Sequence, residues 1–380
     1  MPLQLLAQQY LPISPRHVSL LTTDGSGENP AAVVAVSSAF DPLNRVFFLE
    51  WDDPTEAASF RLSHVSVPGS SVTAISLMLS SEGVVHCVVQ GREGNGNGVG
   101  GSGAAAVSYV YRRTENSDED NYGEEGGAAV TYRKLPKSVE DDGRGWTAAL
   151  HLHCGSRSRL VGEGGEGRVV VACGGERGEA NALKLLHLRG TRMAVQQTIE
   201  LPTLSTFPVL QLREIDGDAA SVLALCHHAV LEVDTRLKHS DSVVRAWKWT
   251  PHDPLITFAV KDNSIVAGTE DGVLVVWDLR ISAVREKSSG AVDHSPPCGA
   301  PVTGLHMPYS MSLLSCHADG SVLTWDRRTT TDGVFRFLPS STDALPPVFV
   351  GTPGCVTLAA EEHLAVVADE SGTLSVFAMS

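Results

Sequence analysis

Cysteine pairs and long apolar runs are missing from this sequence. The seven cysteines are scattered along 380 residues, and no two of them have the CxxC spacing. Such an odd, unpaired set indicates reduced thiols, which favours a chain of the nucleus or cytoplasm. No stretch approaches roughly 18 clean apolar residues, so we expect no transmembrane helix and no membrane insertion. The first residues, MPLQLLAQQYLPISPR, lack a basic segment followed by an apolar run, so we expect no signal peptide.

Basic residues are also few. The chain has 29 Lys and Arg against 44 Asp and Glu, which gives a formal net charge of −15. Binding to nucleic acid or to an anionic membrane surface needs clustered Lys and Arg, so this balance argues against both partners. The hydrophobic fraction of 42% is enough for a real core, and 36 Gly with 20 Pro suit a fold rich in turns.

Signatures of catalysis and cofactor binding are absent. The motifs GxSxG, HExxH and GxxxxGK(S/T) do not occur, and no acid/base pair stands out among the carboxylates. Gly96, Gly98 and Gly101 match GxGxxG, but a dinucleotide site needs this motif between a strand and a helix, whereas here it lies in low-complexity Gly and Asn. We therefore expect no catalytic residue and no cofactor.

Two groups of His and Cys have the composition of zinc ligands. They are His151, His153 and Cys154, and Cys226, His227 and His228. Zinc needs three or four ligands that converge tetrahedrally. In a strand, alternate residues share one face and the residue between them points to the other, and neither group has a spaced partner group. We interpret them as strand residues and expect no metal site.

What the sequence does contain is a repeat. Three C-terminal segments each have an apolar run, a turn on Asp-Gly or Ser-Gly, and a second apolar run. They are SIVAGTEDGVLVVWDLR (264–280), SLLSCHADGSVLTWDRR (312–328) and LAVVADESGTLSVFAMS (364–380). Strand, tight turn and strand at a spacing of about 45–50 residues is typical of a repeat whose unit is a four-stranded sheet. Weaker copies upstream bring the count to seven units, which begin near residues 17, 71, 145, 207, 255, 301 and 354.

The positions that recur most clearly between the repeats are interpreted as structural. A Trp at the end of a third strand fills the gap between neighbouring sheets, and an Asp-Gly turn supplies the positive φ that a two-residue hairpin needs. The residues assigned these roles are Trp277, Asp278, Trp325, Asp326, Asp271, Gly272, Asp319 and Gly320.

These segments resemble WD40 repeats, a family whose fold is a β-propeller that binds other proteins. The Gly-His pair that usually opens a repeat is absent from the two best units, and Trp51-Asp52 is a third WD-like strand end without an Asp-Gly turn before it. The predicted fold is all-β: a single seven-bladed propeller over residues 1–380. The last unit has three strands of its own, so we expect residues 3–12 to pair with it and close the ring.

Polar segments interrupt the repeat and are predicted to be surface insertions. They are residues 91–103, 115–127, 137–145 and 285–300. Segment 115–127 has almost no apolar residues and is too polar to order itself. Ser117, which acidic residues follow, has the context of an acidophilic kinase site, and the alternative is a solvated loop that no kinase modifies.

Residues 255–380 resemble the C-terminal half of the small WD-repeat nucleoporins of the Y-shaped outer-ring complex. The likeness rests on the order EDG-x4-WDLR then ADG-x4-WDRR, and on Pro353, Gly354 and Cys355 before a short last unit. It implies a structural subunit of the nuclear pore at the nuclear envelope, one that serves protein and mRNA transport and is monomeric within a hetero-complex. Its implied partner is a helical-solenoid nucleoporin, docked on the edge of the propeller.

Two alternatives remain open at this point. One is a cytoplasmic WD40 adaptor in trafficking or ubiquitin ligation, which the sequence does not distinguish from a nucleoporin. The other is a hydrolase on a propeller, which would bring two or three carboxylates or histidines to the central channel from the first strands of successive units. The first strands at 255–260, 302–307 and 355–361 are mostly apolar with one His, which favours a scaffold.

Two loops between strands, 250–254 and 296–300, are candidates for partner contacts. Trp247 and Trp249 share a strand face. They could form an exposed aromatic hot spot, but core packing is the favoured interpretation.

Overall fold

The computed structural model describes most of the chain in separate ranges. These are residues 3–23, 30–38, 41–52, 60–69, 71–80, 84–92, 106–115, 130–135, 145–152, 168–174, 180–189, 192–201, 208–215, 218–237, 239–249, 252–280, 293–294, 300–329, 335–339, 348–349, 355–361 and 363–379. Within them the chain forms strands β1 to β29 and a short 3-10 helix, η1 (His239–Ser242). No helix in these ranges is long and apolar enough to cross a membrane.

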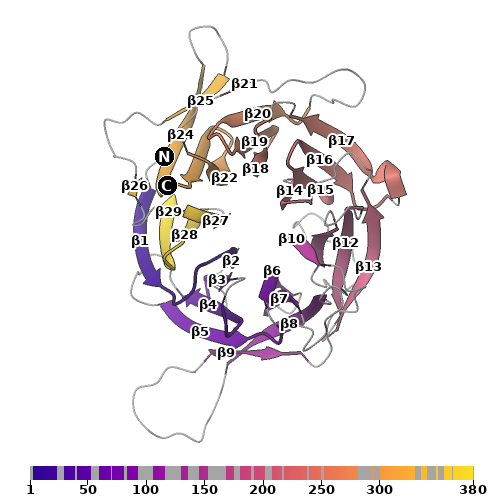
Figure 1. Ribbon diagram of the computed structural model, residues 1–380, viewed down its shortest axis with the longest axis vertical. Coiled ribbons are helices and arrows are strands. Elements are labelled where there is room, and N and C mark those ends of the chain that lie inside the picture. The colour runs from indigo at the N-terminus through magenta and orange to yellow at the C-terminus, as the bar shows by residue number, and fades with distance from the viewer. Residues whose placement is uncertain are drawn as a thin grey trace, which may run out of the picture.

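Seven antiparallel sheets form a ring around a central axis (Figure 1). Blade 1 contains β2 (His17–Thr22), β3 (Ala32–Ser37), β4 (Arg45–Trp51) and β5 (Phe60–Ser66). Blade 2 contains β6 (Ser71–Leu79), β7 (Val85–Arg92), β8 (Ala106–Glu115) and β9 (Val130–Lys134). Blade 3 contains β10 (Trp146–Leu152), β11 (Arg168–Cys173), β12 (Ala182–Arg189) and β13 (Arg192–Glu200). Blade 4 contains β14 (Gln211–Ile215), β15 (Asp218–Cys226), β16 (Ala229–Asp234) and β17 (Val243–Lys248).

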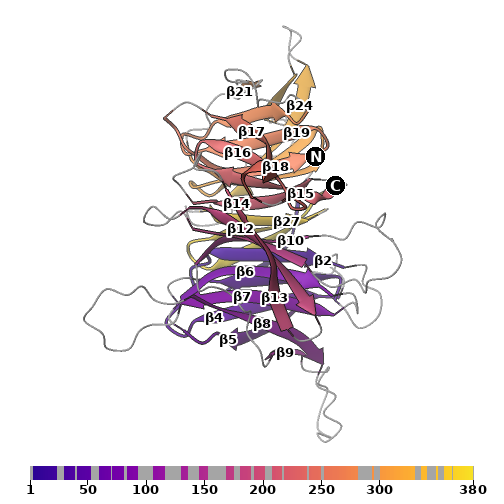
Figure 2. The ribbon, with the colours of Figure 1, turned by 90° about the vertical axis from the view of Figure 1, so that its right-hand side faces the viewer.

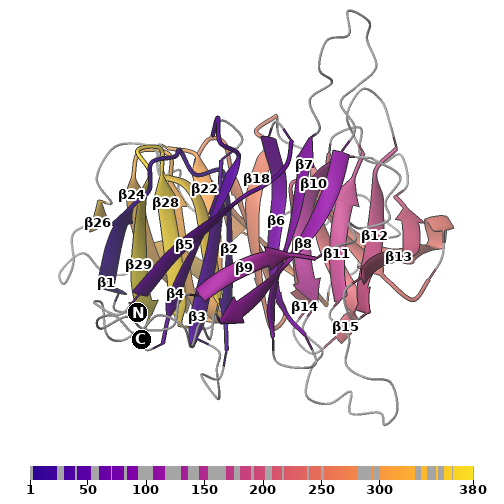
Figure 3. The same cartoon turned by 90° about the horizontal axis from the view of Figure 1, so that it is seen from below.

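The three remaining blades follow the same order from the axis outward. Blade 5 contains β18 (Leu255–Lys261), β19 (Ser264–Thr269), β20 (Leu274–Asp278) and β21 (Asp293–His294). Blade 6 contains β22 (Val302–Tyr309), β23 (Ser312–His317), β24 (Ser321–Thr329) and β25 (Phe335–Pro339), and β26 (Val348–Phe349) also pairs with β24. Blade 7 contains β27 (Cys355–Glu361), β28 (Leu364–Asp369), β29 (Thr373–Met379) and β1 (Leu3–Tyr10). The side views show strands that run between the two faces of the ring (Figures 2 and 3).

The second strands of the blades are mostly apolar and mostly buried. Every residue of β3 and of β19 is buried, so both alternate faces of these strands are covered. This burial follows from the ring, because each sheet has a neighbouring sheet on either side. It also explains why the runs AVVAVS and SIVAGT have almost no polar alternation.

The hydrophobic core is divided among the blade interfaces. Each of the seven clusters of buried side chains draws its members from two adjacent blades. One example joins Phe48 of blade 1 to Tyr132 of blade 2, whose rings stack with centroids 3.7 Å apart. Burial of apolar area between successive sheets therefore stabilises the ring as a whole.

The first and last parts of the chain complete one blade together. Strand β1 pairs antiparallel with β29, from Leu3 opposite Met379 to Tyr10 opposite Thr373. Beyond the strand, Leu11 N donates to Gly372 O at 2.8 Å. Figure 1 shows the two ends of the chain close together on this blade. The predicted seven-bladed fold and its closure by the N-terminal strand are both confirmed. The four predicted insertions lie largely outside the described residues.

Candidate functional site

The Trp residues of the repeat lie in blade interfaces. Trp277 on β20 is 1% exposed and packs in the cluster between blades 4 and 5. Trp325 on β24 is equally buried and packs between blades 5 and 6. The glycines of the adjoining turns, Gly272 and Gly320, have φ of 81° and 88°. Asp271 begins the turn at Gly272, and Asp319 accepts a hydrogen bond from Ser321 N at 2.9 Å.

A hydrogen-bonded chain supports the Trp of blade 6. Trp325 Nε1 donates to Ser315 Oγ at 2.7 Å, and Ser315 Oγ lies 2.8 Å from His317 Nε2. His317 Nδ1 lies 3.3 Å from Ala300 O, and burial lowers the pKa of this imidazole. His317 is the last residue of β23, the second strand of the blade that also contains Trp325. A buried polar chain of this kind fixes the orientation of the Trp ring.

Blade 5 lacks this chain. Ala267 occupies in β19 the place that Ser315 has in β23, because each lies four residues before the turn Asp. Trp277 Nε1 is buried and has no hydrogen-bond partner. Asp278, the next residue, accepts hydrogen bonds from Arg280 N and Arg280 Nε at 2.8 and 2.9 Å. These bonds with Arg280 lower the pKa of Asp278. Asp326, the corresponding residue of blade 6, pairs with Ser312 in the ladder.

A buried ion pair joins blades 1 and 2. Arg113 Nε on β8 lies 3.1 Å from Glu50 Oε1 on β4, and the two side chains are 4% and 1% exposed. Tyr132 on β9 donates its hydroxyl to Glu50 Oε1 at 2.7 Å. Burial, and then the charge of Glu50, raise the pKa of Tyr132 well above its usual value. These residues hold two sheets together.

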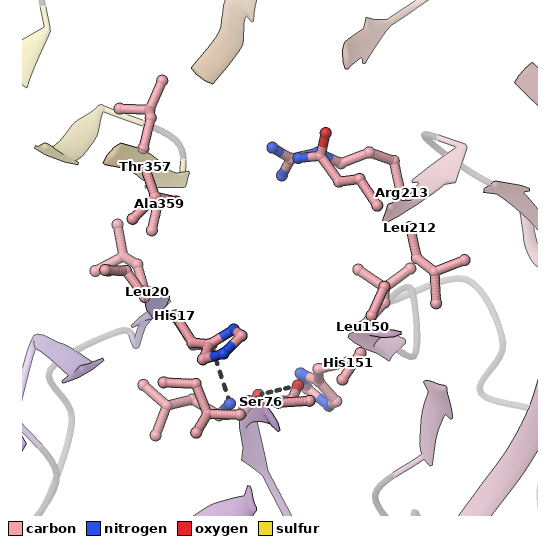
Figure 4. Close-up of a pocket in the computed structure, with 18 of the residues that line it drawn as sticks. His17, Leu20, Ser76, Leu150, His151, Leu212, Arg213, Thr357 and Ala359 are labelled. Carbon is pink, nitrogen blue, oxygen red and sulfur yellow. Dashed lines mark hydrogen bonds between the residues drawn. The ribbon is translucent and has the colours of Figure 1, made fainter. Parts of the chain in front are cut away.

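The central channel is a cavity of about 350 Å³ (Figure 4). The innermost strand of every blade contributes to its lining: β2, β6, β10, β14, β18, β22 and β27. An innermost strand has one edge without a neighbouring strand, so its N–H groups need other acceptors. Side chains of the preceding blade supply some of these acceptors. Ser19 Oγ accepts from Leu77 N at 3.0 Å, and Gln211 Oε1 accepts from Phe258 N at 3.0 Å.

Charged and titratable groups also face the channel. Arg213 on β14 and His17 on β2 extend toward its middle, and His151 on β10 lies beside Ser76 (Figure 4). Burial lowers the pKa of Arg213 to about 10, which leaves the guanidinium protonated at pH 7. Burial, and then the charge of Arg16, lower the pKa of His17 to about 4, so this imidazole is neutral at pH 7.

The two predicted His/Cys groups are not brought together as metal ligands among the described residues. His151 lines the channel, whereas His153 and Cys154 lie outside the described ranges. Cys226 is buried at the end of β15, and His227 and His228 form the turn that follows it. The described residues contain no group of three His, Cys, Asp or Glu side chains placed to hold a metal ion.

Of the other candidate residues from the sequence, some are buried and others lie outside the described residues. Trp247 and Trp249 are 1% and 8% exposed, so the core-packing interpretation is confirmed. Ser117 and the GxGxxG glycines lie outside the described residues, as do parts of the loops 250–254 and 296–300.

The sequence patterns did not point to His17 or Arg213, and His151 was considered only as a zinc ligand. The search for channel residues covered the first strands of the last three blades, where His306 is the one histidine and does not line the channel. Alignment of all seven units on their first strand would have shown these polar residues, because they lie in the first strands HVSLLT, WTAALHL and QLREI.

Comparisons with known proteins support the fold and do not identify a family. No protein-family model and no curated protein matches this chain. Among solved structures, 1037 chains match, so the architecture is shared by many proteins and does not select a function. One match is Raptor of Chaetomium thermophilum, with a TM-score of 0.56 and 17% sequence identity over 99% of this chain. The match spans 29% of the Raptor chain, and it shows that the described sheets form a seven-bladed β-propeller of known type.

Proposed function

We propose that this protein is a non-enzymatic scaffold that binds other subunits of a large assembly along its outer edge. The observation that supports this function is exposed apolar surface on the outermost strands. Leu5 and Tyr10 on β1 are 47% and 65% exposed, and Leu62 on β5 is 46% exposed. Strands β1 and β5 follow one another around the rim (Figure 1). Apolar side chains gathered on adjacent elements are typical of a protein-binding surface.

The partner that we propose is a helical-solenoid nucleoporin of the nuclear pore outer ring. A helix that lies along the rim would present a row of apolar side chains at intervals of three and four residues, which suits the exposed Leu5 and Leu62. The resemblance of residues 255–380 to small WD-repeat nucleoporins supports this choice of partner and a location at the nuclear envelope.

Affinity purification of the tagged chain under mild salt, with the recovered proteins identified, tests this function. We expect nucleoporins to be recovered with the wild-type chain, and to be lost when the rim carries Leu5→Asp and Leu62→Asp together. Leu43→Asp is the matched control, because Leu43 is 60% exposed but lies in the turn between β3 and β4 instead of on an outermost strand. Recovery of trafficking or ubiquitin-ligase components instead would replace the nucleoporin assignment. Equal recovery with both variants would contradict binding at the rim.

A further inference from the structure

Arg213 places a positive charge in the central channel, and none of the carboxylates that the structure describes forms an ion pair with it. Figure 4 shows its guanidinium extending from β14 toward the middle of the channel. Its Nε is buried without a hydrogen-bond partner, and no described residue forms an ion pair with it. Arg213 is half-buried, its guanidinium stays protonated at neutral pH, and partial removal from water without an opposite charge costs free energy. An anion bound beside Arg213 would therefore stabilise the folded chain.

Two acidic residues are candidates to pair with Arg213, one on its own strand and one on the channel wall, and neither is placed to do so. Glu214 follows it on β14 and points to the other face of the sheet, because side chains alternate along a strand. Glu361 is the one carboxylate among the described residues that line the channel, and its Oε2 accepts a hydrogen bond from Thr22 N at 2.6 Å. Arg16 also lines the channel. The wall thus has excess positive charge in a chain whose net charge is −15.

The other polar groups of the wall suit an oxyanion. Thr257, Thr303 and Thr357 line the channel from three successive blades, and Ser76 lines it from blade 2. The hydroxyls of Thr257, Thr303 and Ser76 donate to Gln211 Oε1, Cys316 O and Leu77 O, so each must turn from that acceptor to donate to a ligand, whereas Thr357 Oγ1 has no such bond to exchange among the described residues. Hydroxyl groups donate hydrogen bonds to phosphate and carboxylate oxygens, and arginine binds both anions with a charge-assisted pair of hydrogen bonds. Figure 4 shows Thr357 and Ser76 on the wall around the open centre toward which Arg213 extends.

We propose that the central channel binds a small molecule through a phosphate or carboxylate group, with Arg213 as the residue that contacts the anion. A cavity of about 350 Å³ is at the small end of the range for ligand pockets, so it admits a metabolite and excludes a folded domain. This site lies on the axis of the ring and is separate from the rim. Either proposal can therefore fail without the other.

Calorimetric titration of the purified full chain tests the site, with inorganic phosphate and citrate as probes at ionic strength matched with sodium chloride. We expect saturable binding of one or both probes, and Arg213→Gln to weaken it by about tenfold or more. Binding of phosphate alone would assign a phosphorylated ligand, and binding of citrate alone a carboxylate. Arg280→Gln is the matched control, because Arg280 is an arginine whose side chain is 71% exposed beside Asp278. The control is expected to bind like the wild type.

Failure of both probes to bind at millimolar concentration would overturn the proposal, and so would equal affinity in Arg213→Gln. The wild-type protein allows a second test that needs no folded variant. The nuclear magnetic resonance signal of the Arg213 Nε–H group is expected to shift as the bound probe is added. An unmoved signal during saturable binding would place the anion elsewhere and would also overturn the proposal.

Discussion

Glu361 and Thr22 are 339 residues apart in the chain, yet Glu361 Oε2 accepts a hydrogen bond from Thr22 N at 2.6 Å. The bond joins the innermost strand of blade 7 to that of blade 1. It closes the ring at the channel, just as the pairing of β1 with β29 completes blade 7 at the rim. The junction between the first and last blades is therefore held at both its inner and outer edges.

Removal of the outer closure is expected to lower stability sharply. Deletion of residues 3–10 removes β1 and leaves β29 as an exposed edge strand, with its ladder hydrogen bonds unmade. Differential scanning calorimetry should show a fall in Tm of several degrees or more. Gln4→Ala, which changes an exposed side chain of β1, is the control and should leave the melt unchanged. A deletion variant that melts like the wild type would contradict closure by β1.

The inner closure should also be measurable. Glu361→Ala leaves the Thr22 N–H without its acceptor, which we expect to cost about 1–2 kcal/mol of unfolding free energy. Glu361→Gln keeps an oxygen acceptor at the same place and should lose less. Urea denaturation of the three proteins makes the comparison. Equal stability of the alanine and glutamine variants would show that this hydrogen bond contributes nothing.

The ion pair of Glu50 and Arg113 gives a coupling prediction. Glu50→Ala removes the carboxylate that lies 3.1 Å from the buried Arg113 Nε, and we expect a loss of about 3–5 kcal/mol of unfolding free energy. The double variant Glu50→Leu with Arg113→Met removes both charges and should be clearly more stable than Glu50→Ala. A double-mutant cycle by chemical denaturation, made of Glu50→Leu, Arg113→Met and the double variant, measures this coupling. Additive losses would mean that the two side chains do not interact energetically.

Trp277 and Trp325 differ in whether Nε1 has a hydrogen-bond acceptor, and exchange of that acceptor should change stability in opposite directions. Ala267→Ser places a hydroxyl where blade 6 has Ser315, and it should accept a hydrogen bond from the unpartnered Trp277 Nε1. We expect this substitution to stabilise the fold by about 0.5–1.5 kcal/mol, and Ser315→Ala to destabilise it by about 1–3 kcal/mol. The free energy of unfolding from urea titration tests both. Destabilisation by Ala267→Ser would show that blade 5 has no room for the hydroxyl.

Acid pH is expected to lower stability through His17. Burial, and then Arg16, lower its pKa from 6.5 to about 4 in the folded chain. The unfolded chain therefore binds more protons between these two pH values, and the free energy of unfolding falls as pH decreases through this window. Urea titrations at pH 7 and pH 5 measure the fall, and His17→Gln should reduce it.

The reduction will be partial, because burial also lowers the pKa of His317 and of His227, and both residues remain in the variant. A pH dependence identical to that of the wild type would contradict the assignment to His17.

The number of blades could be predicted because the relevant information is local. Residues 264–280 and 312–328 each contain two strands, the turn between them and the Trp that fills a blade interface, all within one short segment. The closure was also predictable, because residues 3–10 had no other assigned role and the last unit lacked a strand.

The contacts between blades could not be predicted in the same way. Glu50 meets Arg113 and Ser19 meets Leu77 only after each blade has been placed beside the next one. The pairing depends on strand register and on the twist between sheets, which a run of apolar residues does not specify. Arg213 was overlooked for a different reason, because the first strands of all seven units must be aligned before one arginine can be assigned to the channel.

The role of the rim as a binding surface is tested most directly by quantitative cross-linking of the affinity-purified complex. We expect a stoichiometric protein partner whose cross-links map to the outer strands around β1 and β5, and the loss of that partner with Leu5→Asp and Leu62→Asp. Recovery of the chain without any companion, together with turnover of a substrate by the purified chain, would contradict it.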